Sequence, residues 1–213
     1  MITKLLAIAL ALGLVTTANL AKTVSPKRIN AKSMPDFSDM ALVDLKNGIN
    51  AIDLDGDGLK DMVVSGYRSN ANAHDYVFTT FYSNETSSDG SEWGLVTFFD
   101  IRDMPKADYF RDFEGADCTL EDIALLQSKA LHPQPVIVVI AKREFGSTFI
   151  DKMPVTFDIY ETVRDKYGGI GHPNVYFRQV RHLRAKHDYC DVNKAMQVEL
   201  GVPIPDDGVG DGD

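Results

Sequence analysis

Four closely spaced aspartates are the residues of this chain best placed to do chemistry. Residues 53–61 read DLDGDGLKD. The oxygens of this segment fall at loop positions one, three, five, seven and nine, and they belong to Asp53, Asp55, Asp57, the carbonyl of Leu59 and Asp61. Calcium takes about six to eight oxygen ligands from such loops, and Gly58 at position six permits the sharp turn that brings alternate side chains together. The spacing therefore predicts one calcium ion bound by residues 53–61.

The same loop departs from an EF-hand. Position twelve, which carries a bidentate glutamate in an EF-hand, is Val64, and the flanking residues favour strands over helices. The segment resembles the DxDxDG loops of extracellular β-rich modules, so we expect Asp61 to complete the site. A structural ion is then favoured over a regulatory one. The alternative is an acidic turn between two strands that binds no metal.

No catalytic constellation stands out elsewhere in the sequence, and no catalytic residue is predicted. The chain has no HExxH or HxH pattern, no GxSxG, SxxK or KTG motif and no glycine-rich phosphate loop. His182 and His187 lie five residues apart, a spacing that aligns them on neither a helix nor one strand face, so we expect both at the surface. A pair of carboxylates could still act together among the 31 acidic residues, because spatial neighbours need not be close in sequence. A non-catalytic protein is favoured.

Two polar stretches that follow predicted strands form a candidate recognition surface. Its residues are Arg68, Asn72, His74, Arg143 and Glu144. Loops that follow strands commonly carry function. The alternative is that both stretches are ordinary solvated turns.

Short apolar runs rich in Val, Ile, Phe and Tyr, bounded by Gly, Pro, Asn or Asp, predict strands. They cover residues 48–54, 61–68, 76–83, 92–99, 135–142, 155–162 and 175–183. Residues 136–141 are apolar throughout, which predicts a central strand covered on both faces. In 155–162 apolar and polar residues alternate, and the pattern assigns Tyr160 to the wet face.

One helix is predicted near the end of the chain. Asp191 is placed to cap a helix over residues 192–200, and Gly201 closes it. The stretch that begins at Thr119 fits either a helix or a strand. Together these patterns predict a mainly β (α+β) fold, a single domain built on antiparallel sheet with a C-terminal helix.

The start of the chain has the order of a secretory signal. Lys4 precedes an apolar run over residues 5–15 and then small residues, and eleven apolar residues are too few for a spanning helix of about 20. We expect a signal peptide at 1–21, a leader segment at 22–46, the domain at 47–202 and a disordered acidic tail at 203–213. The mature protein is then periplasmic or secreted, with no membrane insertion after signal cleavage.

Export also bears on the cysteines and on the partners of the protein. An oxidising compartment favours a disulfide between Cys118 and Cys190, the alternative being two buried thiols. The net charge of −9 argues against nucleic acid and anionic membrane as partners, because neither attracts a surface of the same sign.

Several segments in a fixed order resemble a known family. NGINAIDLDGDGLKDMVV is followed by RSNANAHDY, VIVVIAKREFG, VTFDIYE and YCDVNKAMQVEL. Over residues 47–200 this order is similar to the carbapenem self-resistance proteins of the CarG type. The resemblance implies a periplasmic protein of Gram-negative bacteria that protects against a carbapenem without being a recognised β-lactamase. The bound partner would be a carbapenem or a cell-envelope component. An envelope hydrolase using a carboxylate pair and a structural calcium-binding module are the alternatives.

Overall fold

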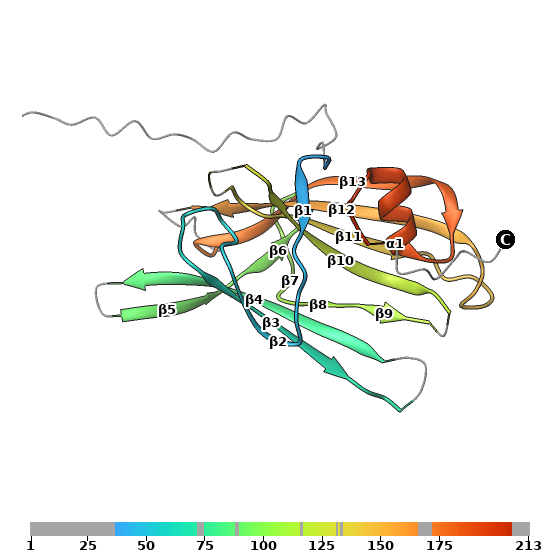
Figure 1. Cartoon of the computed structure of the whole chain (residues 1–213), viewed down its shortest axis with the longest axis horizontal. Helices are drawn as coiled ribbons and strands as arrows, with labels where there is room; N and C mark the ends of the chain where they lie inside the picture. The colour runs from blue at the N-terminus through green and yellow to red at the C-terminus, as the bar shows by residue number, and fades with distance from the viewer. Residues whose placement is uncertain are drawn as a thin grey trace, which may run out of the picture.

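The described residues of the computed structural model form two β-sheets that pack face to face, with a short helix on the outer face of one (Figure 1). The structure describes residues 37–205 except 72–74, 88–89, 116, 131, 133 and 166–171. The predicted signal peptide and residues 206–213 of the predicted tail lie outside this range. The mainly β fold with a C-terminal helix is as predicted.

The larger sheet, here called sheet A, has eight strands in the order β1-β10-β11-β12-β13-β6-β7, and β9 pairs with β10. Neighbouring strands of this sheet are antiparallel except β13 and β6, which are parallel. The strands are β1 (Met40–Leu42), β6 (Thr97–Phe99), β7 (Pro105–Ala107), β9 (Phe113–Glu114), β10 (Thr119–Ser128), β11 (Ile137–Arg143), β12 (Met153–Arg164) and β13 (Val175–Tyr189).

The smaller sheet, sheet B, has five antiparallel strands in the order β2-β3-β4-β5, with β8 paired to β4. The strands are β2 (Gly48–Ile52), β3 (Asp61–Arg68), β4 (Tyr76–Ser87), β5 (Gly90–Leu95) and β8 (Phe110–Arg111). The turn between β2 and β3 is the aspartate loop, so the ends of two paired strands position the four carboxylates.

Two apolar cores explain the layers. One lies between the sheets and contains Val63 and Phe81 of sheet B together with Val138 and Phe177 of sheet A. The other lies between sheet A and the C-terminal helix. Sheet A is therefore covered on both faces, and β11 is the buried central strand that the run at 136–141 predicts.

This double coverage corrects one prediction from the alternating pattern of residues 155–162. The pattern assigns Tyr160 to the wet face, but this residue is 1% exposed and packs in the core between the sheets. The alternation distinguishes the two faces of β12 correctly, since Phe157 and Ile159 lie in the helix-side core. Alternation alone does not reveal that a second sheet covers the face that carries Tyr160.

The predicted strand at 92–99 is two strands in different sheets. β5 ends at Leu95 and β6 begins at Thr97. Between them Val96 is fully buried, and its N–H donates to the carbonyl of Phe81 at 2.9 Å. The chain crosses from sheet B to sheet A at this residue without a turn, so no Gly or Pro marks the boundary.

The stretch from Thr119 is a strand, β10, and the helix predicted at 192–200 is present. The Asp191 side chain accepts hydrogen bonds from the N–H groups of Asn193 and Lys194. The helix runs as α1 (Val192–Ala195) and a π-helical turn, η1 (Met196–Leu200), which ends at Gly201 with φ 71°.

Part of the segment treated as a leader packs into the domain. β1 lies within residues 22–46 and pairs with β10, and Phe37 is buried in the helix-side core. Among the described residues, no helix is long and apolar enough to span a membrane.

Candidate metal centre

The aspartate loop curls around the side chain of its first aspartate. One carboxylate oxygen of Asp53 accepts the N–H of Gly56 at 2.7 Å, and the other accepts the N–H of Gly58 at 2.9 Å. Both glycines have positive φ, 78° and 88°, a conformation that side chains rarely adopt. A Cβ at Gly56 would also lie 2.9 Å from backbone atoms of Gln134 and Pro135. The glycines therefore have a conformational reason to occupy these two positions.

Three of the four aspartates converge. Asp53, Asp55 and Asp61 are 5%, 8% and 1% exposed, and each offers an oxygen within 4.8 Å of those of the others. Two oxygens bound to one calcium ion at about 2.4 Å can be at most about 4.8 Å apart. The geometry of the group and its hard oxygen donors therefore allow it to hold a metal ion.

Burial makes two of these carboxylates, those of Asp55 and Asp61, costly to ionise. Loss of hydration raises the pKa of Asp61 to about 6, although the N–H groups of Asn84 and Leu54 donate to its two oxygens and act in the opposite direction. Burial likewise raises the pKa of Asp55, against the lowering effect of a neighbouring guanidinium. A bound cation would stabilise the ionised form of both groups.

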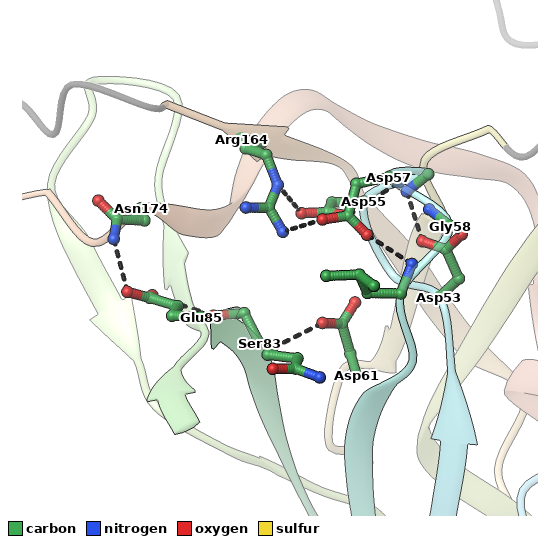
Figure 2. Close-up of polar contacts among 12 residues, drawn as sticks. Asp53, Asp55, Asp57, Gly58, Asp61, Ser83, Glu85, Arg164 and Asn174 are labelled. Carbon is green, nitrogen blue, oxygen red and sulfur yellow. Dashed lines mark hydrogen bonds and ion pairs between the residues drawn. The ribbon is translucent and has the colours of Figure 1, made fainter. Parts of the chain in front are cut away.

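That guanidinium belongs to Arg164 at the end of β12, in the opposite sheet. Its Nε pairs with the carboxylate of Asp55, and its Nη2 lies 2.8 Å from an oxygen of Asp57 (Figure 2). The side chain of Arg164 is 24% exposed, whereas that of Asp55 is fully buried. Arg164 thus brings one positive charge to a loop with four negative ones and joins the loop to sheet A. Sequence analysis missed it, because 109 residues separate it from Asp55.

The remaining predicted ligands have other surroundings. Asp57 faces Arg164, and its other oxygen accepts the N–H of Leu59 at 2.8 Å. Leu59 itself is 44% exposed. The structure therefore brings together Asp53, Asp55 and Asp61 and leaves Asp57 paired with the arginine.

A second polar network lies beside the loop. Figure 2 shows Glu85 of β4 between Ser83 and Asn174: the Ser83 hydroxyl donates to one carboxylate oxygen at 3.2 Å, and the Asn174 side chain donates to the other. Asn174 directly precedes β13, so this network also connects the two sheets. The loop itself is contacted from both layers, by Arg164 of sheet A and by the N–H of Asn84 of sheet B.

Comparison with known proteins agrees with this architecture. The family model described as "Carbapenem resistance protein CarG-like" matches residues 45–198. The chain belongs to the CarG-like family. A crystal structure of CarG superposes with a TM-score of 0.57 at 23% sequence identity, covering 74% of this chain and 94% of CarG. At that identity the match shows a shared fold. Comparison with curated protein sequences gave no match.

The disulfide predicted from the export of the chain is formed. Cys118 and Cys190 are joined, with their Cα atoms 5.6 Å apart. Asp191, which caps α1, also accepts the N–H of Thr119 at 3.1 Å. The covalent bond and this hydrogen bond together hold the start of β10 beside the start of the helix.

The residues of the candidate recognition surface have different surroundings. Asn72 and His74 lie outside the described residues. Arg68 is exposed at the end of β3 and donates to the Tyr76 hydroxyl at 2.8 Å. Glu144 is about half exposed and pairs with Arg184 at 3.4 Å.

Arg143 corrects that prediction, because it is 2% exposed. Its Nη1 donates to the carbonyls of Phe149, Asp151 and Cys190, at 2.9, 2.7 and 3.3 Å. Burial lowers the pKa of this guanidinium. Arg143 therefore holds the loop after β11 against the disulfide and does not face solvent.

The two histidines predicted at the surface are exposed. The side chains of His182 and His187 are 61% and 73% exposed.

Proposed function

We propose that this protein is a non-catalytic periplasmic binding or protective protein, stabilised by one calcium ion in the 53–61 loop. The observation that carries the metal part is the convergence of three buried carboxylates, those of Asp53, Asp55 and Asp61. The protective part rests on membership of a family described by carbapenem resistance.

The charge balance of the loop supports a divalent cation. The loop carries four aspartates, and Arg164 pairs with two of them. The ionised loop therefore keeps an excess negative charge, and three of its aspartates are buried. Calcium accepts irregular oxygen cages, whereas magnesium requires a smaller octahedral shell and keeps its waters. Residues 53–61 offer carboxylates from the start, the middle and the end of the loop. This irregular arrangement suits calcium better than magnesium.

A structural role for the ion follows from what the loop supports. The carboxylate of Asp61 holds the N–H groups of Leu54 and Asn84 at 2.7 and 2.8 Å. Leu54 is fully buried in the core between the sheets. An ion that fixes Asp61 would fix the packing of that core, so calcium would stabilise the fold.

Protection without turnover is the functional expectation. The sequence has neither the SxxK and KTG motifs of serine β-lactamases nor the HxH pattern of zinc enzymes. The proposed binding partner is a carbapenem or a cell-envelope component.

The decisive experiment combines turnover and survival. Purified protein is assayed for hydrolysis of a carbapenem and of nitrocefin, and cells that express the chain are challenged with the carbapenem. A chain without residues 1–21, which would stay in the cytosol, is the matched control. Protection by the full chain only, without hydrolysis, is the expected result. Hydrolysis would favour the carboxylate-pair enzyme, and neither effect would leave a structural calcium-binding module.

A further inference from the structure

A cavity of about 280 Å³ lies between the two sheets. Its apolar walls come from the segment that joins β1 to β2 and from strands of both sheets, and they include Leu42, Leu45, Phe110, Ile123 and Leu125. Three further lining residues are exposed and mark the mouth, namely Asp44, Asn47 and Tyr67. The cavity is therefore open to solvent and is close to the lower end of the size range of small-molecule sites.

Asp112 is a buried carboxylate in the wall of this cavity. It follows β8, where Phe110 and Asp112 are buried and Arg111 between them is exposed, so its side chain points between the sheets. It is 7% exposed, and one carboxylate oxygen accepts the N–H of Val77 at 2.6 Å. The other oxygen has no hydrogen-bond partner within the described residues. A buried carboxylate with a free acceptor is expected to find a partner.

The other polar groups of the cavity leave that oxygen free. The hydroxyls of Ser65 and Thr79 are buried in the wall and lie 3.5 Å from each other. Asp122 also lines the cavity, but it accepts the N–H of Ile123 at 2.7 Å and a hydrogen bond from the Asn193 side chain. Asp112 is therefore the acceptor available to a ligand.

The charged side chains that line the cavity determine which sign of ligand charge it favours. The described lining residues include three aspartates and no lysine or arginine. Burial, and secondarily the negative charges of Asp122 and Glu114, raise the pKa of Asp112 to about 7. The carboxylates of the lining would repel an anion, whereas an ammonium group would form a charge-assisted hydrogen bond to Asp112.

We propose that this cavity binds a small organic ammonium compound, with the ammonium group on Asp112 and an apolar body against Leu42, Phe110 and Leu125. The site is separate from the aspartate loop and needs no metal. It goes beyond the proposed protective function, and either can fail without the other.

Calorimetric titration of the calcium-saturated protein with three probes of one shape tests the proposal. Benzylamine is a cation, benzyl alcohol is its neutral counterpart and benzoate is an anion. We expect benzylamine to bind at least about tenfold more tightly than benzyl alcohol, and benzoate to bind most weakly. Equal affinity for benzylamine and benzyl alcohol, or no saturable binding of benzylamine, overturns the proposal.

Two variants locate the binding. Asp112→Asn keeps the shape and the acceptor for Val77, and it should weaken benzylamine binding by about tenfold or more while leaving benzyl alcohol unchanged. Asp188→Asn removes the same charge at an exposed position of β13 that does not line the cavity, and it should change benzylamine affinity by less than roughly threefold. Unchanged benzylamine binding in Asp112→Asn overturns the assignment. If that variant does not fold, the order of the three probes on the wild-type protein still decides.

Discussion

Removing calcium from the 53–61 loop should lower the free energy of unfolding, and Asp55→Ala should abolish most of that calcium dependence. Asp53, Asp55 and Asp61 each have an oxygen within 4.8 Å of the others. At that separation two unit charges repel by about 3.5 kcal/mol for an effective dielectric constant of about 20. Arg164 offsets only part of this repulsion, because it pairs with Asp55 and Asp57. Repulsion of this size is enough to loosen the start of β3 when no ion is bound.

The gain from calcium follows from mass action. Calcium at a hundredfold above its Kd adds about 2.7 kcal/mol to the free energy of unfolding. For a domain of this size that corresponds to a rise in Tm of roughly 5 to 11 °C. Magnesium should produce a much smaller rise, because its octahedral shell is smaller and holds its waters more firmly.

The assay is thermal unfolding followed by circular dichroism in calcium, in magnesium and in chelator, at matched ionic strength. Asp44→Ala is the control, since its side chain is 75% exposed and pairs with Lys46 outside the loop. This control should keep the full calcium increment. Coincident melting curves of the wild-type protein in all three solutions would refute the metal site, and a full increment in Asp55→Ala would refute the ligand assignment.

Four further outcomes are expected. Arg164→Gln should cost about 1 to 3 kcal/mol in chelator and less in saturating calcium, as measured by urea unfolding, because the ion then supplies the missing charge. Cys190→Ser opens a disulfide that spans 72 residues, and on the chain-entropy model it should cost about 4 kcal/mol in the same assay. The pKa of Asp112 rises from 3.8 to about 7 on folding. The contribution of this group to the free energy of unfolding is therefore complete below pH 3.8 and is lost as the pH rises through about 7. Asp112→Asn should therefore flatten the pH profile of urea stability by about 1 to 3 kcal/mol over that window, and an unchanged profile would contradict the shift. Signal cleavage after Ala18 or Ala21 should give a periplasmic protein that starts at Asn19 or Lys22. Its intact mass should be two hydrogens lighter than that of the reduced form, whereas full-length cytosolic protein would contradict export.

Features that depend on neighbours in the chain could be predicted from the sequence. The aspartate loop is one, because its turn is set by glycines and by hydrogen bonds such as Gly58 N–H to Asp53, five residues apart. The helix capped by Asp191 is another, since the cap bonds groups two and three residues away. The strand β3 has its predicted bounds, Asp61–Arg68, for the same reason. The alternation of buried and less buried side chains along a strand depends on consecutive residues. The disulfide could be predicted because the signal-like start of the chain indicates an oxidising compartment and the chain holds only two cysteines.

Only the tertiary structure decided which distant residues meet. The charge partner of Asp55 is Arg164, and no local pattern links residues 109 positions apart. Tyr160 is buried because a second sheet covers its face, and Arg143 is buried because three backbone carbonyls surround its guanidinium. The cavity around Asp112 likewise needs both sheets. Periodicity reports the two faces of a strand but not what covers each of them, and that depends on contacts that form only when the sheets pack.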